Sequence, residues 1–257
     1  MGRFDGYLLC SDFDGTLAGA GGLVSARNLE AIEYYKAEGG LFTLASGRNP
    51  RFLKTYCDIT HPNAPVISLN GGIIADARSC QTLDFITFPE SPLSMLEDLA
   101  CRFPQLHTIH AWRPNGDIVI WQRQSGLSPF EALGGKEAVY SHALTIQDAS
   151  VMPAVLSDAK QKYAGRYRFE SSWPEGIEIT PVFGGKGAAL QRLRALIGPS
   201  VRVTVGMGDY ENDISLLKQA DIGIAVSNAL NEVKKAADIV TVSNCEDALW
   251  HVVNLLL

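Results

Sequence analysis

The feature that most constrains the fold of this sequence is the alternation of short, unbroken apolar runs with segments of helical pattern. Runs occur at 7–11, 41–47 and 64–72, and again at 201–209, 222–226 and 239–242. They lack the polar alternation of half-exposed strands, as is typical of strands buried on both faces. Between them lie helical patterns, such as 26–39 after the N-cap Ser25 and 186–198 before a closing glycine. The sequence therefore predicts an α/β fold, a Rossmann-like, doubly wound parallel sheet.

The middle of the chain has a different pattern. Asn115-Gly116 separates two β-rich runs in "IHAWRPNGDIVIWQRQ" and predicts a hairpin turn, which brings in antiparallel strands. We therefore expect a discontinuous core of residues 1–73 and 182–257, with residues 74–181 inserted as an α+β cap domain. Trp112 and Trp121 are expected to pack against the helices of this domain rather than to contact a ligand.

Composition excludes several classes of partner. The 257 residues are 46% hydrophobic and carry 22 basic against 28 acidic side chains, a net charge of −6, with no basic block suited to nucleic acid. No apolar run is long enough to span a membrane, and the N-terminus lacks the apolar segment of a signal peptide, so we expect a cytoplasmic protein. The five scattered cysteines favour reduced thiols over disulfides or a zinc site. The sequence carries no signal for oligomeric state.

Polar side chains follow the apolar runs where each run ends. Asp12 and Asp14 end the first run, and Asp209 ends a later one, with Asp213 four residues on. Asp14-Gly15 taken alone also fits a hairpin turn. In a parallel sheet, however, the carboxyl ends of the strands lie at one edge. Carboxylates gathered there repel one another unless a cation neutralises them. We predict a Mg²⁺ site with Asp12 and Asp209 as ligands, the main-chain carbonyl of Asp14 as a third, and Asp213 as a supporting or alternative ligand.

Two further polar residues suit an anion at the same edge. Lys186 opens a predicted helix among glycines, where it is either solvated or reaches a phosphate as a point charge. Ser46, followed by Gly47, ends the second run, where its hydroxyl either caps the next helix or binds a phosphate oxygen. His107 and His110 are predicted to face opposite sides of a strand, which argues against a shared metal.

Four separated motifs together resemble one known family. They are "DFDGT" (12–16), "ASGR" (45–48), "GGKGAAL" (184–190) and "GDYENDISLL" (208–217), supported by "LNGG" (69–72), by "GIEITP" (176–181) at the end of the insertion and by "AVSNALNEVKKAADIVT" (225–241). The sequence resembles the haloacid dehalogenase-like phosphohydrolases, specifically the Cof-type group with a large inserted cap. This resemblance implies a Mg²⁺-dependent phosphatase of small phosphorylated metabolites, sugar phosphates among them.

The resemblance also implies a role for each matching residue. Asp12 becomes the nucleophile that forms an aspartyl-phosphate, and Asp14 the general acid and then base. Ser46 with Gly47, Lys186 and Asn212 face the phosphate, while Asp209 and Asp213 complete the metal site. Arg48 is either structural or in contact with substrate.

Other functions on the same fold stay open at this point. One is a phosphoglycomutase or other phosphotransferase, which passes the phosphoryl group to an acceptor other than water. Another is a non-catalytic regulatory binding module. The glycine-rich loop at 18–24 is too short to cover the site, so the cap is expected to supply the lid.

Overall fold

A computed structural model describes residues 2–134 and 140–256 and confirms the predicted parallel α/β core. Its main sheet has the order β13-β12-β11-β1-β2, and each neighbouring pair is parallel. The bounds of these strands are β1 (Tyr7–Ser11), β2 (Leu41–Leu44), β11 (Val203–Gly208), β12 (Ile222–Ala225) and β13 (Ile239–Val240). Since β1 lies between two other strands in a sheet with helices on its faces, the four residues that follow Tyr7 in this strand are all buried.

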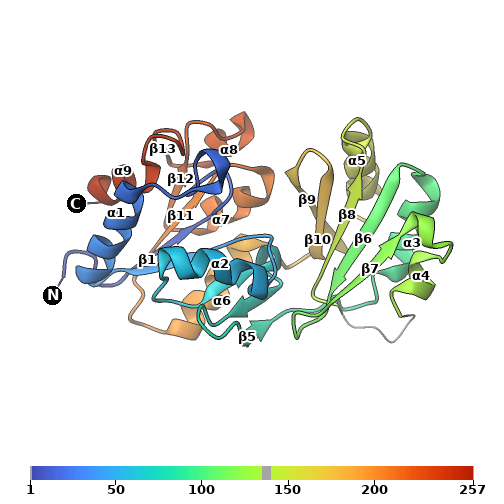
Figure 1. Cartoon of the computed structure of the whole chain (residues 1–257), viewed down its shortest axis with the longest axis horizontal. Coiled ribbons are helices and arrows are strands. Elements are labelled where there is room, and N and C mark those ends of the chain that lie inside the picture. Colours follow the sequence, from blue (N-terminus) through green and yellow to red (C-terminus); the bar gives the residue numbers. More distant parts are fainter. Residues whose placement is uncertain (1, 135–139, 257) are drawn as a thin grey trace.

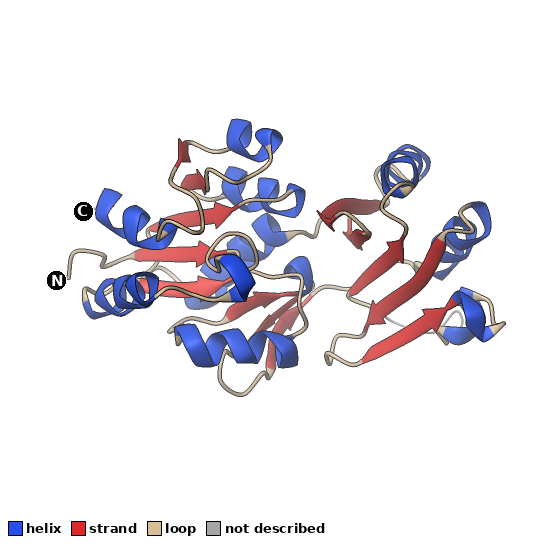
Figure 2. Ribbon diagram, turned by 45° about the horizontal axis from the view of Figure 1, so that its top comes forward, coloured by secondary structure: helices blue, strands red, loops and turns tan. Residues whose placement is uncertain are grey.

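Helices lie on both faces of this sheet (Figure 2). They are α1 (Ala26–Ala37), α2 (Pro50–Thr60), α6 (Lys186–Ile197), α7 (Ile214–Gln219), α8 (Asn231–Ala236) and α9 (Ala248–Leu255). Ser25 is the N-cap of α1, as predicted, and its side chain accepts a hydrogen bond from the Asn28 amide. The N-cap of α2 is Asn49, so Ser46 does not have the capping role that was its alternative.

The insertion forms a second lobe, shown at the right in Figure 1. Its sheet has the order β7-β6-β8-β10-β9 and is antiparallel throughout. The strands are β6 (Leu106–Trp112), β7 (Ile118–Gln122), β8 (His142–Gln147), β9 (Tyr167–Trp173) and β10 (Gly176–Pro181), and the helices are α3 (Leu93–Arg102), α4 (Pro129–Ala132) and α5 (Met152–Lys162). The predicted hairpin at Asn115-Gly116 joins β6 to β7, and Gly116 takes the positive φ of 83° that such a turn needs.

A small sheet connects the two lobes. It consists of β3 (Val66–Ser68), β4 (Ile73–Ala75) and β5 (Thr82–Phe85), paired antiparallel in that order. The apolar run at 64–72 therefore reaches the parallel sheet only through a bridge between Ala45 and Ile67. β4 lies in the same buried cluster as β1, and β5 pairs with β4 and contacts α6 through Asp84 and Arg192, so we propose that the inserted domain begins after β5 rather than at residue 74.

The two lobes have separate hydrophobic clusters, one around the parallel sheet and one between the cap sheet and its helices. All five cysteines are free thiols. Within residues 2–134 and 140–256, no helix combines the length and apolar character needed to cross a bilayer.

Candidate functional site

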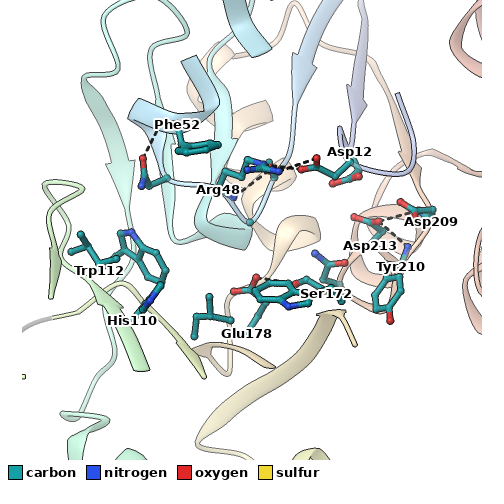
Figure 3. A pocket seen from close by; sticks show the side chains of 18 residues that line it. Asp12, Arg48, Phe52, His110, Trp112, Ser172, Glu178, Asp209, Tyr210 and Asp213 are labelled. Carbon is teal, nitrogen blue, oxygen red and sulfur yellow. Dashed lines mark hydrogen bonds and ion pairs between the residues drawn. The ribbon is translucent and has the colours of Figure 1, made fainter. Parts of the chain in front are cut away.

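The predicted polar residues gather at one edge of the parallel sheet. Ser11 of β1 pairs with Met207 of β11, so Asp12 and Asp209, which follow these strands, emerge close together. Figure 3 shows them facing the cap across a cavity. Gly15 has a φ of 84°, and a β-carbon there would lie 2.5 Å from Asp209 Oδ2. Glycine is therefore required at this turn because any side chain would collide with the Asp209 carboxylate.

Three of the predicted acidic residues form one cluster. Carboxylate oxygens of Asp12, Asp209 and Asp213 all lie within 4.8 Å of one another. Lys186, whose side chain is 1% exposed, places its Nζ 2.6 Å from Asp12 Oδ1 and 2.5 Å from Asp213 Oδ1. One buried ammonium thus faces three carboxylates, which leaves the cluster short of positive charge.

The pKa values reflect this imbalance. Burial, together with the neighbouring Asp213 and Asp209, raises the pKa of Asp12 well above its ordinary value, although Lys186 opposes the shift. Burial and the nearby Asp213 raise the pKa of Asp209 to about 6. Burial disfavours the charged form of Lys186, but Asp12 and Asp213 outweigh this effect and raise its pKa. Carboxylates that lack positive charge are the donor set that a hard divalent cation prefers, so these residues fit Mg²⁺.

Asp213 differs from the other two acids because both of its oxygens have protein partners. Its Oδ1 contacts Lys186, and its Oδ2 accepts hydrogen bonds from the amides of Asp209 and Tyr210 at 3.0 and 3.1 Å. These bonds hold the turn that carries Asp209. The sequence left two roles open for Asp213, a supporting residue or an alternative metal ligand. These contacts favour the supporting role.

The carboxylate of Asp14 turns away from this cluster. Its Oδ2 and Oδ1 accept hydrogen bonds from Arg48 Nε and Nη2 at 2.8 and 3.0 Å. The Asp14 side chain is 48% exposed. The guanidinium of Arg48 also lies over the rings of Phe52 and Tyr56, and its pKa is raised chiefly by the hydrogen bond to Asp14. Arg48 therefore holds Asp14 and lines the cavity at the same time.

The predicted phosphate-facing residues lie beside the acidic cluster. Asn212 donates from Nδ2 to Asn70 Oδ1 at 3.0 Å, while the buried Nδ2 of Asn70 has no partner among the described residues. A β-carbon at Gly47 would lie 3.1 Å from that same Nδ2, so Gly47 lets the chain pass close to Asn70. Ser46, 2% exposed, lines the cavity next to Gly47. Ser46 and Asn212 thus line the cavity, while Asn70 and Lys186 contact the lining residues Asn212 and Asp12.

The cavity itself has a volume of about 660 Å³ and lies between the lobes. Its core wall holds the following residues: Asp12, Asp14, Ser46, Gly47, Arg48, Asn49, Phe52, Asp209, Tyr210, Asn212 and Asp213. Its cap wall consists of residues that were not predicted to line a site: His110, Trp112, Ile118, Leu144, Ser172, Trp173 and Glu178. Trp121 packs as predicted, but the expectation for Trp112 was incomplete, because its ring both packs against the core cluster and lines the cavity.

The two histidines of β6 lie in different surroundings, and the pairing of β6 with β8 shifts register between Leu106 and Thr108, next to His107. His107 is exposed and contacts Asp148 at 2.8 Å, whereas His110 faces the cavity. Burial lowers the pKa of His110 below its ordinary value. Glu178 lies within the motif "GIEITP" (176–181), but the motif does not reveal that it faces the cavity, because strand pairing over long chain separations brings the cap-wall residues together.

Contacts between cap and core flank the cavity on two sides. Glu211 of the core pairs with Lys160 of α5 and accepts a hydrogen bond from the amide of Ser171 in β9 at 2.9 Å. On the other side, Arg51 lies 3.7 Å from Asp117, which follows the β6–β7 turn. The structure therefore has the cap docked over the acidic cluster.

Comparisons with known proteins agree with this architecture. The haloacid dehalogenase-like hydrolase family matches residues 9–112 and 130–253. Among curated relatives, two 5-amino-6-(5-phospho-D-ribitylamino)uracil phosphatases of Bacillus subtilis strain 168 are 28% and 25% identical. The first covers 96% of both chains, and the second covers 94% of this chain and 92% of its own.

Solved structures share the whole fold. A haloacid dehalogenase-like hydrolase from Bacteroides thetaiotaomicron is 26% identical with a TM-score of 0.75, covering 98% of this chain and 99% of its own. A sugar phosphatase of subclass IIB superposes with a TM-score of 0.80 at 19% identity, covering 98% of this chain and 100% of its own, which shows the fold alone. The family match spans most of both lobes, and the chain belongs to the haloacid dehalogenase-like hydrolases, as its motifs predicted.

Proposed function

We propose that this protein is a Mg²⁺-dependent phosphomonoester hydrolase that acts on small phosphorylated metabolites through an aspartyl-phosphate. The observation that carries the proposal is the buried arrangement of Asp12, Lys186 and Asp213 beside Asp209 at the floor of the cavity. Membership of a hydrolase family with phosphatase relatives supports the same chemistry.

In the first step, an oxygen of Asp12 attacks phosphorus and forms a P–O bond while the bond to the ester oxygen breaks. Asp14 donates its proton to the departing alkoxide, which would otherwise be a poor leaving group. In the second step, Asp14 takes a proton from water, the water oxygen bonds to phosphorus, and the Asp12–phosphorus bond breaks to release inorganic phosphate. To act in this way, Asp14 must exchange its contact with Arg48 for the substrate.

Asp12, Asp209 and the main-chain carbonyl of Asp14 would hold Mg²⁺, with Asp213 behind them. When bound, the cation supplies positive charge to the acidic cluster and to the phosphoryl oxygens. Lys186, Ser46, Asn212 and the backbone at Gly47 would hold the phosphate. Lys186 contacts Asp12 already, so it orients the attacking carboxylate and offsets negative charge as the phosphoryl group arrives.

The proposal is tested with p-nitrophenyl phosphate and Mg²⁺. We expect hydrolysis that EDTA abolishes and that Asp12→Asn reduces to background. Asp58→Asn is the matched control, since Asp58 is exposed on α2 and outside the cavity. Wild-type turnover in Asp12→Asn would exclude the covalent mechanism. Transfer to a sugar acceptor with little free phosphate would instead identify a phosphotransferase, and no turnover on any ester a binding module.

A further inference from the structure

The apolar side chains of the cap wall lie on one face of the cap sheet. Trp112 of β6 lies opposite both Ile118 of β7 and His142 of β8, and Leu144 follows two residues after His142. Side chains at opposed positions, and side chains two residues apart on one strand, project to the same side of a sheet. Trp112, Ile118 and Leu144 therefore form one apolar surface. All three line the cavity, and Figure 3 shows Trp112 on the side opposite to Asp12.

Phe52 extends this apolar surface from the core. It reaches the cavity from α2 and is 56% exposed, while Ile118 on the facing lobe is 40% exposed. A single exposed apolar side chain is common on protein surfaces, but these two lie on facing walls of one cavity. Both keep apolar area in contact with water, so a ligand that covers them gains free energy from its burial.

The acidic and hydroxyl groups of the cap wall already have partners within the cap. Ser172 donates a hydrogen bond to Glu178 Oε1 at 2.9 Å, and His142 Nε2 lies 2.5 Å from Oε2. Glu178 is 3% exposed, so its carboxylate is held inside the cap rather than offered to a ligand. This leaves His110 as the principal polar side chain that the described part of the cap wall can offer.

The shortage of polar partners disfavours a polar leaving group. Arg48 is the sole lysine or arginine among the described residues that line the cavity, and it lies on the core wall, where it binds Asp14. A polyol or a charged group against the cap would give up its hydrogen bonds to water and regain few of them. An apolar group loses no hydrogen bonds on entering.

Building on the proposed function, we propose that the leaving group of the substrate is an apolar alcohol. Its carbon skeleton packs on the surface of Trp112, Ile118 and Leu144 and covers Phe52, while the phosphoryl group lies at Asp12. Ile118 and Leu144 are then specificity-determining residues. The cavity volume of about 660 Å³ is within the range of small-molecule sites.

The inference is tested with n-hexyl phosphate and D-glucitol 6-phosphate. Both are primary phosphate monoesters on an unbranched six-carbon chain, and they differ only by the hydroxyl groups of glucitol. We expect wild-type kcat/KM to be roughly 100-fold higher for hexyl phosphate. The hydroxyl groups withdraw electrons and make glucitol the better leaving group, so intrinsic reactivity opposes the expected preference.

The replacement Ile118→Thr tests the apolar surface of the cap. Threonine keeps the β-branched shape that suits β7 but brings a hydroxyl to the cavity, so the preference for hexyl phosphate should fall roughly tenfold. Ile120→Thr is the matched control and should keep the wild-type ratio. Ile120 lies two residues further along the same strand, is 47% exposed and is outside the cavity lining.

Leu144→Ala tests the buried part of the same surface, since Leu144 is 7% exposed. It should lower kcat/KM for hexyl phosphate by about tenfold or more and change the value for glucitol 6-phosphate little. Circular dichroism checks that this variant is folded. Because Ile118 is largely exposed, its replacement tests the surface even if Leu144→Ala does not fold.

The two proposals fail in different ways. If the wild-type protein with Mg²⁺ does not hydrolyse p-nitrophenyl phosphate, the proposed function is wrong. If it does so but hydrolyses hexyl phosphate no faster than glucitol 6-phosphate, the inference about the leaving group is wrong. An unchanged ratio in Ile118→Thr, or an equal change in Ile120→Thr, would overturn the role of the cap surface.

Discussion

The replacement Lys186→Met tests whether this lysine balances the acidic cluster. The thioether has a similar length but no charge, so Asp12, Asp209 and Asp213 are left with oxygens within 4.8 Å and no ammonium among them. Removing one partner of a buried ion pair costs about 3–5 kcal/mol. We therefore expect the free energy of unfolding to fall by roughly that amount near neutral pH, and phosphatase activity to be lost.

The pH dependence of this loss distinguishes charge from packing. The folded-state pKa of Asp209 is about 6 with the lysine present, above its unfolded value, and removing the lysine raises it further. A group with a raised pKa favours the folded state while it is protonated, so stability is retained at low pH and falls as pH rises through the folded-state pKa. The destabilisation should therefore be small at about pH 5 and large at about pH 7.5.

The assay is urea unfolding followed by circular dichroism at both pH values, with and without Mg²⁺. We expect Mg²⁺ to restore part of the lost stability at the higher pH, because it supplies the missing charge. Lys218→Met, an exposed position on α7, is the control and should change stability little. An equal loss at both pH values, with no recovery in Mg²⁺, would refute the charge-balance argument.

Three further predictions follow from the same site. Asp12→Asn should abolish turnover yet keep or increase metal-free stability in thermal melts, because burial makes its charge unfavourable; clear destabilisation would contradict this. Asp14→Asn should slow hydrolysis of alkyl phosphates by about 10²–10⁴-fold but affect p-nitrophenyl phosphate less, since p-nitrophenolate leaves without a proton; equal losses on both would argue against an acid role. Metal-free wild-type protein should lose up to about 3 kcal/mol of stability between pH 4 and pH 8 through Asp209, whose pKa is about 6; a flat urea-unfolding profile would show that this carboxylate is not perturbed.

The site residues of the core could be predicted from the sequence because several of them come directly after predicted strands. Asp12 and Asp209 come after neighbouring parallel strands, and their meeting needs only the parallel arrangement that the apolar runs predict. Lys186 was found by its motif, but its contacts with Asp12 and Asp213 depend on the packing of α6 against α7. Motif spacing identifies such residues without revealing which of them pair.

The cap wall could not be predicted in this way. Glu178, His110 and Trp112 lie on strands whose order, β7-β6-β8-β10-β9, is set by pairing between distant segments. A single sequence predicts the hairpin of β6 and β7, because these strands are adjacent in the chain. It does not predict that β8 and β10 pair beside them, because those strands are distant in the chain. The contact of Asp14 with Arg48 was not predicted either, because the long side chain of Arg48 can reach several partners and the sequence does not show which one it binds.

The contacts of Glu211 couple the docked cap to the segment that carries two of the site residues. This residue joins the cap through Lys160 and the Ser171 amide, and it directly precedes Asn212 and Asp213 in the chain. A molecule too bulky for the cavity would hold the lobes apart, and Glu211 would then lose both cap partners. The segment that carries Asn212 and Asp213 would then be held by core contacts alone, so the fit of a substrate in the cavity and the support of this segment depend on the same docked cap.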